Sequence, residues 1–244
     1  MTKIYFASDL HLGVPNKSIS LEREKLFVKW LDEIKKDATA LYLVGDIFDF
    51  WFEYKKAVPK GYIRLLGKLA ELSDSGIPIH FFTGNHDMWV FDYLEKEISL
   101  TIYRKPLEIT LNNKRFFIGH GDGLGPKDYG YKFIKRIFAN KLCQWLFEKV
   151  HPNIGISIAE YWSKKSRIAN GEKDETFHGD NEWLTQFCKE KLKTTTIDFF
   201  IFGHRHLPLN IDLNQNSKYI NLGEWVNYKS YAVFDGESLE LKYF

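Results

Sequence analysis

The chain has 244 residues, of which 44% are hydrophobic, and this suits one large domain or one domain with a sizeable insertion. A net charge of +2 gives no global field for nucleic acid, and two distant cysteines, Cys143 and Cys188, exclude a disulfide framework or a thiolate metal site. The sequence has no signal-peptide pattern and no apolar run of about 20 residues, so we predict a cytoplasmic protein.

Short apolar runs of strand length recur along the chain, and most of them end in Gly, Asp or His. They cover residues 3–8, 40–45, 77–84, 115–121, 197–203, 218–223 and 230–236. Helical patterns lie between the early runs, at 21–36 and 61–76, and residues 107–119 read as a hairpin across Asn112 and Asn113. The alternation of strands and helices predicts an α/β (α+β) fold with a largely buried sheet.

Residues 125–193 differ from the rest, because they contain helical patterns and no convincing strand. We predict a helical insertion, or lid, over this range, and a core made of residues 1–124 and 194–244. The longest pattern, 128–150, predicts a helix with an aromatic face beside basic residues. The face consists of Tyr129, Phe133, Ile134, Ile137, Phe138, Trp145, Leu146 and Phe147, and the basic residues are Lys132, Lys135, Arg136, Lys141 and Lys149. This face suits a membrane surface, packing on the core, or a dry groove for acyl chains.

Five polar motifs follow the apolar runs: SDLHLG, GDIFD, GNHD, GHGD and GHRH. They supply Asp9, His11, Asp46, Asp49, Asn85, His86, Asp87, His120, Asp122, His204 and His206. In α/β folds ligands bind beyond the carboxyl ends of the strands, so we expect the motifs to meet at one rim. Alternation along extended D-x-H and H-x-H segments would aim both side chains of each pair to the same side.

The donor set of these motifs predicts a metal site. Aspartate, imidazole and an asparagine carbonyl, without sulfur, suit Mn, Fe, Co or Zn. Four histidines, two aspartates and one asparagine are enough for two metals that share a carboxylate, an arrangement that serves phosphoester hydrolysis. A lone histidine within a strand is more often a core residue, and we interpret His80 in that way.

The order D-x-H, G-D-x-x-D, G-N-H-D, G-H-G-D, G-H-x-H resembles the calcineurin-like metallophosphoesterase family. The resemblance implies a β-sandwich flanked by helices and two divalent metal ions, with Mn²⁺ expected. It implies one metal on Asp9, His11, Asp46 and His206, and a second on Asp46, Asn85, His120 and His204. His86 would contact the scissile phosphate, with Asp87 orienting it. Asp49 and Asp122 would either hold ligating imidazoles or serve as capping and turn residues.

The insertion resembles that of the UDP-2,3-diacylglucosamine hydrolases of lipid A synthesis, through the segments HGDGLGPKD and SRIANGEK. The resemblance implies substrate contacts from Asn85, His86, Asp128, Ser166, Asn170, Lys173 and His204. It implies hydrolysis of the pyrophosphate bond of UDP-2,3-diacylglucosamine to UMP and 2,3-diacylglucosamine 1-phosphate (lipid X), at the cytoplasmic face of the inner membrane. Three positions depart from the best-known branch of that family: His86 stands where it has Arg, Arg205 where it has Thr, and Leu207 where it has Arg.

Other functions remain open on the sequence. One is a metal-dependent phosphodiesterase for another nucleotide or phospholipid. A second is a binding module that lost catalysis, which the complete set of expected metal ligands disfavours. A third is a nuclease, which the near-neutral net charge of +2 disfavours, so no nucleic acid is expected as a partner. We predict no protein partner.

Overall fold

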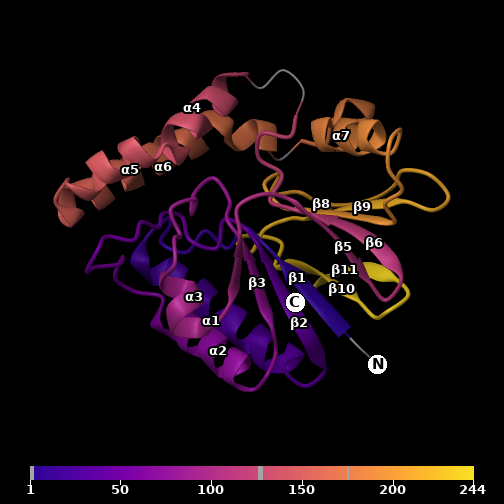
Figure 1. The fold of residues 1–244 in the computed structure, drawn as a ribbon, viewed down its shortest axis with the longest axis horizontal. Helices are drawn as coiled ribbons and strands as arrows, with labels where there is room; N and C mark the ends of the chain where they lie inside the picture. Colours follow the sequence, from indigo (N-terminus) through magenta and orange to yellow (C-terminus); the bar gives the residue numbers. More distant parts are fainter. Residues whose placement is uncertain (1–2, 126–128, 175) are drawn as a thin grey trace.

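Two β-sheets pack face to face with helices on their outer sides, and a group of helices extends from one end of them (Figure 1). This computed structural model describes residues 3–125, 129–174 and 176–244. The β-sandwich flanked by helices that the motif order implies is confirmed.

The first sheet has six strands in the order β11-β10-β1-β2-β3-β4. Its strands are β1 (Lys3–Ala7), β2 (Ala38–Val44), β3 (Ile79–Phe82), β4 (Thr101–Tyr103), β10 (Ser230–Phe234) and β11 (Leu239–Tyr243). Strands β1 to β4 are parallel, whereas β10 and β11 form an antiparallel edge. Its outer face is covered by α1 (Lys17–Ile34), α2 (Ile63–Asp74) and α3 (Tyr93–Ile98) (Figure 1).

The second sheet has five strands in the order β5-β6-β7-β9-β8. Its strands are β5 (Leu107–Leu111), β6 (Lys114–Ile118), β7 (Phe199–Phe202), β8 (Pro208–Asp212) and β9 (Lys218–Leu222). Strands β6, β7 and β9 are parallel neighbours. Helix α7 (Trp183–Lys191) packs on the outer face of this sheet through Leu184 and Cys188, next to the 3₁₀ turn η1 (Gly179–Asn181).

Strand β2 shows why the predicted runs are apolar throughout. Leu41 and Leu43 pack toward the helices of the first sheet, whereas Tyr42 and Val44 pack between the two sheets. A strand that is buried on both faces cannot alternate apolar and polar residues. Each fully buried side chain of this size contributes about 1.5–3 kcal/mol, so the run stabilises both layers of the core at once.

Local turn chemistry sets the hairpin between β5 and β6. Asn112 and Asn113 have φ values of 46° and 63°, and a two-residue hairpin turn with positive φ at both positions favours asparagine. The predicted hairpin is therefore confirmed. Strands β4, β8 and β11 were not predicted, because they are short or interrupted by polar residues and depend on a neighbouring strand.

The predicted helix over 128–150 is wrong in its continuity. The chain forms α4 (Tyr129–Ala139) and α5 (Lys141–Glu148), because the Asn140 side chain accepts hydrogen bonds from the backbone of Leu142 and Cys143 and begins a new helix. Helix α6 (Pro152–Asp174) returns along both (Figure 1). Within the described ranges, none of the helices combines the length and hydropathy that crossing a bilayer requires.

Candidate metal centre

The five motifs begin where five parallel strands end. β1, β2 and β3 of the first sheet, and β6 and β7 of the second, lead directly into them. The carboxyl ends of both groups of strands meet at one end of the sandwich, below the helical group of α4, α5 and α6 (Figure 1). The sandwich thus brings residues that are 195 positions apart into contact, as the facing rings of His11 and His206 show.

Five of these side chains stand on left-handed backbone. The φ values are 54° at Asp9, 44° at His11, 53° at Asp46, 67° at His204 and 52° at His206. Non-glycine residues avoid this region, at a cost on the order of 1–3 kcal/mol each, so such residues gather where function requires them. The extended geometry predicted for D-x-H and H-x-H is therefore wrong, and left-handed turns bring Asp9 and His11 together, with 3.7 Å between Asp9 Oδ1 and His11 Nε2.

The motif glycines are required by close approach. A Cβ at Gly84 would overlap the Asp46 carboxylate, and a Cβ at Gly203 would overlap the Asp9 carboxylate. Each glycine thus lets one strand end come against a carboxylate from another motif. This accounts for the recurrence of glycine at the start of the motifs.

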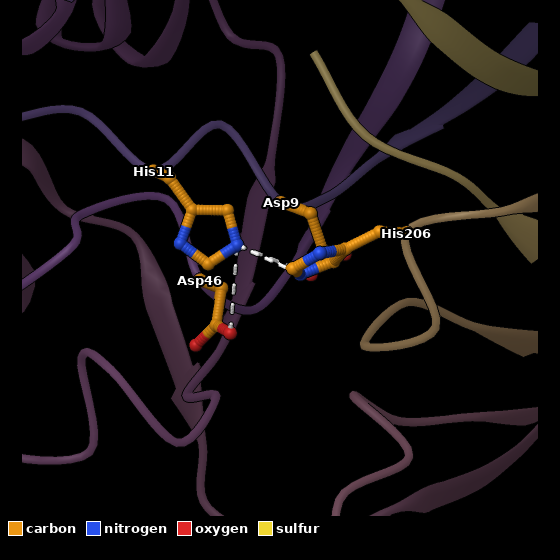
Figure 2. Close-up of side chains that lie close together, drawn as sticks. All are labelled: Asp9, His11, Asp46 and His206. Atoms are coloured by element: carbon orange, nitrogen blue, oxygen red, sulfur yellow. Dashed lines mark hydrogen bonds and ion pairs between the residues drawn. The ribbon is translucent and has the colours of Figure 1, made fainter. Parts of the chain in front are cut away.

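A first cluster consists of Asp9, His11, Asp46 and His206, with one possible ligand atom from each within 4.8 Å of the others (Figure 2). His11 Nε2 lies 3.0 Å from His206 Nε2 and 3.9 Å from Asp46 Oδ2. His206 Nε2 lies 3.3 Å from Asp9 Oδ1. Asp9, His11 and Asp46 are buried, and their ligand atoms point to a common centre.

A second cluster shares Asp46 with the first and adds His120 and His204. His120 Nε2 lies 3.2 Å from Asp46 Oδ2 and 3.2 Å from Asn85 Oδ1. A contact at its other nitrogen holds the orientation of the His120 ring, because Nδ1 lies 2.9 Å from the carbonyl oxygen of Val44. An Nδ1–H that donates to this carbonyl leaves the Nε2 lone pair free for a cation.

The clusters fit divalent cations on their own geometry. Asp46 Oδ2 is buried without a hydrogen-bond partner among the described residues, although two imidazole nitrogens lie close to it. The facing Nε2 atoms of His11 and His206 can bond to each other only if one of them is protonated, whereas both can bind one cation with their lone pairs. Oxygen and nitrogen donors of this kind suit Mn, Fe, Co or Zn.

The ionisation of the clusters follows from burial and mutual charge. Burial alone would raise the pKa of Asp46, but the imidazoles of His120, His86 and His11 hold it well below its ordinary value. Burial would lower the pKa of His120, but the Asp46 carboxylate raises it to about 10. Burial lowers the pKa of His204 to about 4. The field that holds a proton on His120 is the field that would attract a metal cation in its place.

His86 lies beside the first cluster, and its surroundings correct one prediction. Its ring Nδ1 lies 3.0 Å from the carbonyl oxygen of Asp49 and 3.2 Å from Ser163 Oγ. Asp87 instead accepts hydrogen bonds from backbone N–H groups, including Ile47 at 2.8 Å and Gly84 at 2.7 Å. The predicted role of Asp87 in orienting the His86 ring is not supported by these contacts, because Asp87 holds the turns that carry the ligands.

The same buried groups have shifted pKa values. Burial lowers the pKa of His86 to about 4. Burial and the neighbouring Asp46 carboxylate raise the pKa of Asp87 to about 7, against the backbone N–H groups that favour its charged form. His86 is therefore a neutral ring at neutral pH when no further charge is present.

Ser163 is a site residue that the sequence analysis missed. It lies on α6, is 9% exposed, and donates a hydrogen bond of 2.8 Å to Asp49 Oδ2. Asp49 Oδ1 in turn lies 3.5 Å from His11 Nδ1. Ser163 therefore connects the helical group to the first cluster, and no motif in the sequence marks it, since a single serine in a helix carries no signal.

Asp122 links the second cluster to α4. Its carboxylate accepts a hydrogen bond from the Tyr131 hydroxyl and lies 2.5 Å from Lys135 Nζ. Burial would raise the pKa of Asp122, but His120 and Lys135 lower it.

The neighbouring prediction, Asp128, lies outside the described residues. The backbone of Ser166, Asn170 and Lys173 belongs to α6, but their side chains also lie outside the described residues.

The aromatic face of the helical group is divided between core and solvent. Phe138 and Phe147 pack on Trp89, with ring centroids 5.5 Å and 4.9 Å from it. Most of the remaining large apolar side chains are exposed, and α6 adds four more. The exposed residues are Phe133, Ile134, Ile137, Leu142, Trp145, Leu146, Ile154, Ile158, Tyr161 and Trp162. We call these exposed side chains on three neighbouring helices the apolar patch; such a surface is typical of a contact with lipid, ligand or partner.

Comparison with known proteins agrees with this geometry. Residues 2–208 match the calcineurin-like phosphoesterase family. A UDP-2,3-diacylglucosamine hydrolase of Porphyromonas gingivalis is 41% identical over 259 residues, which cover 99% of this chain and 97% of that protein. A UDP-2,3-diacylglucosamine hydrolase of Edwardsiella ictaluri is 28% identical, covering 97% and 90%. Among solved structures, the E. coli phosphoesterase Yfce has a TM-score of 0.44 at 18% identity, covering 97% and 90%.

Proposed function

Since this chain belongs to the calcineurin-like phosphoesterase family, it is a metal-dependent hydrolase, and we propose that its substrate is UDP-2,3-diacylglucosamine. Hydrolysis consumes one water, breaks one bridging P–O bond of the pyrophosphate, and leaves one phosphate on each product, UMP and 2,3-diacylglucosamine 1-phosphate. The observation that carries the proposal is the position of two joined ligand clusters beside an exposed apolar patch. A substrate with a charged diphosphate and two acyl chains needs both features.

We propose that the clusters hold two divalent ions, with Mn²⁺ as the native metal. Asp9, His11, Asp46 and His206 would bind the first ion, and Asp46, Asn85, His120 and His204 the second. The shared Asp46 supports two ions rather than one. When bound, such a pair supplies Lewis-acid charge stabilisation for the phosphoryl oxygens and activates water.

The chain's own residues would position the diphosphate and handle its charge. His86 lies within reach of the first cluster, with its ring centroid 4.9 Å from that of His11, and would contact the scissile phosphate. The hydrogen-bond partners at its Nδ1 leave Nε2 for the substrate. Nε2 could donate only from the doubly protonated ring, which the negative charge of a bound diphosphate would favour; it would then stabilise charge on a phosphoryl oxygen or give its proton to the leaving oxygen. Asp87, through the backbone of the ligand-bearing turns, would keep these atoms in register.

The helical group would bind the lipid half of the substrate. We propose that residues 125–193 form a lid, in which Asp128, Ser166, Asn170 and Lys173 contact the glucosamine and phosphate portion. The exposed side chains of α4, α5 and α6 would cover the acyl chains and touch the cytoplasmic face of the inner membrane. Because α7 packs on the second sheet, α4 to α6 are the part of the lid that offers this apolar patch.

The deciding measurement is turnover of UDP-2,3-diacylglucosamine with manganese, beside the soluble diester bis-p-nitrophenyl phosphate. We expect strong preference for the lipid substrate, release of UMP, and loss of activity with a chelator that manganese restores. Cleavage of the soluble diester alone would keep the metal centre but replace the proposed substrate by another nucleotide or phospholipid ester.

A further inference from the structure

A cavity of about 410 Å³ lies beside the second cluster, between the strand ends and α4. One wall comes from β4 and the segment after it, and the other from α4, with His120 and Asp122 at its inner end. A second cavity of about 380 Å³ continues it past Thr83 and Arg104. The volume lies within the roughly 300–1,000 Å³ of small-molecule sites. The basic cleft, as we name the larger cavity, is lined by Arg104, Lys105, Lys132, Lys135 and Arg136.

The basic side chains that line the basic cleft outnumber the carboxylates that line it. Asp122 is the one carboxylate among the described lining residues, and Lys135 and Tyr131 already bond to it. Arg104 donates to the carbonyl oxygens of Val90 and Phe91, and Lys132 to that of Gly125, so their charges meet neutral acceptors. An excess of cations held against neutral groups favours an anionic ligand.

Lys105 and Arg136 line the basic cleft from its two walls, Lys105 from the segment after β4 and Arg136 from α4. No ion pair or hydrogen bond is found for either side chain among the described residues. They come from segments about thirty positions apart, and neither is needed to hold a wall in place. They are therefore the cations most available to a ligand.

Part of the lining of the basic cleft is apolar. Phe82 and Tyr103 line it as a stacked pair, with ring centroids 4.8 Å apart and an interplanar angle of 19°. Pro106 and Leu124 add to the same surface. A ligand that satisfies both halves of the lining has an anionic group and a planar or apolar ring system, which is the chemistry of a nucleoside phosphate.

We propose that the basic cleft binds the nucleoside phosphate half of the substrate, with the cations on the phosphate and the apolar part against the base. The inference rests on the proposed function for the identity of the nucleotide. It also orients the substrate: the nucleotide lies over the second cluster, and the lipid half lies toward Ser163 and α6 beside the first. The cleft then holds the UMP product until it leaves.

The test removes the two available cations and measures nucleotide binding directly. The double variant Lys105→Ala/Arg136→Ala is compared with Lys36→Ala/Arg64→Ala, which removes the same charge from exposed positions on the α1 and α2 side of the first sheet. Titration calorimetry with UMP and with inorganic phosphate is run on manganese-loaded protein. We expect the Kd of UMP to rise about tenfold in the cleft variant and to stay unchanged in the control.

Kinetics give a second, independent readout. In the cleft variant we expect the KM for UDP-2,3-diacylglucosamine to rise about tenfold, whereas the Lys36→Ala/Arg64→Ala control should keep the KM of the unchanged protein. Unchanged UMP binding in the cleft variant would overturn the inference, even if the lipid substrate is hydrolysed. Equal affinity for UMP and inorganic phosphate would overturn the nucleoside assignment. A third outcome separates the two proposals. If the unchanged protein binds UMP but does not hydrolyse the lipid substrate, and the cleft variant loses UMP binding, the nucleotide site is supported and the proposed function is rejected.

Discussion

At the scale of single residues, Asp46 is the side chain that belongs to both ligand clusters of the metal centre. It follows β2, contributes to both clusters, and its Oδ1 accepts the backbone N–H of His86 at 2.8 Å. Its Oδ2 faces the imidazoles of His11 and His120, from two other motifs, and is buried without a hydrogen-bond partner among the described residues. One carboxylate thus joins the two clusters and fixes the turn that bears His86.

Replacement of Asp46 by asparagine should separate chemistry from folding. Asp46→Asn keeps an oxygen for the His86 N–H but removes the shared negative charge. We expect activity to fall by more than about a hundredfold, because even the outer partners of metal ligands are worth 10–100-fold. Bound manganese, measured by elemental analysis, should fall from two ions per chain.

The matched control is Asp212→Asn, which neutralises an exposed aspartate on β8 that pairs only with Lys218 at 3.7 Å. Its activity and metal content should equal those of the unchanged protein. Circular dichroism should give the same spectrum for both variants. Near-full turnover in Asp46→Asn would remove Asp46 from the centre.

At the scale of elements, α5 shows two surfaces with opposite roles. Phe147 packs against Phe52 and Trp89 of the core, at centroid distances of 4.8 Å and 4.9 Å. Trp145, two positions earlier, is 52% exposed, and Phe133 on α4 is 64% exposed. The exposed rings are not packed in the core, and their gathering on one group of helices is typical of a surface that makes an external contact.

The double variant Phe133→Gln/Trp145→Gln tests that contact. Burial of a ring by an acyl chain is worth about 1.5–3 kcal/mol, so we expect the KM for the lipid substrate to rise roughly ten- to a hundredfold. Turnover of bis-p-nitrophenyl phosphate should not change. The free energy of unfolding should change by about 0.5 kcal/mol or less, as for exposed positions elsewhere.

Ile63→Gln provides the comparison for this element. Ile63 is 78% exposed at the start of α2, a helix that lies away from the helical group (Figure 1). Its loss should leave both activities unchanged. An unchanged KM for the lipid in the double variant would favour a soluble substrate and would assign the apolar patch to something other than acyl chains.

At the scale of the whole molecule, the centre joins the two sheets. The first sheet provides Asp9, His11 and Asp46, and the second provides His120 and His204, so a bound cation would connect turns from both. The buried ion pair of Arg205 with Glu182, at 2.6 Å, also ties the last motif to the segment before α7. Metal binding is therefore expected to stabilise the sandwich as a unit.

Manganese should raise the midpoint of thermal unfolding. A ligand at a hundred times its Kd stabilises the folded state by about 2.7 kcal/mol, which for a domain of this size is a shift of roughly 5–10 °C. Differential scanning calorimetry of chelated and reloaded protein measures this shift. The Asp46→Asn variant should lose most of it, and an equal shift in that variant would place the ion elsewhere.

The sequence by itself determined the donor set, the fold class and the hairpin at Asn112 and Asn113. Each depends on information within a few residues: an apolar run, the motif that ends it, or a turn with positive φ. The break at Asn140 was also encoded locally, as a capping residue, but the surrounding helical pattern concealed it. Strands β4, β8 and β11 depended on partners, because a short strand with polar positions is stable only against a neighbour.

Only the tertiary structure decided which side chains meet. The left-handed turns at the ligands, the contact of Ser163 with Asp49, and the basic cleft all join segments that are distant in sequence. Their conformations cost local free energy that the packing of two sheets and several helices offsets, so no local pattern reveals them. The exposure of Trp145 beside the half-buried Phe147 was decided in the same way, because both residues are aromatic in one helix and only the position of the core distinguishes them.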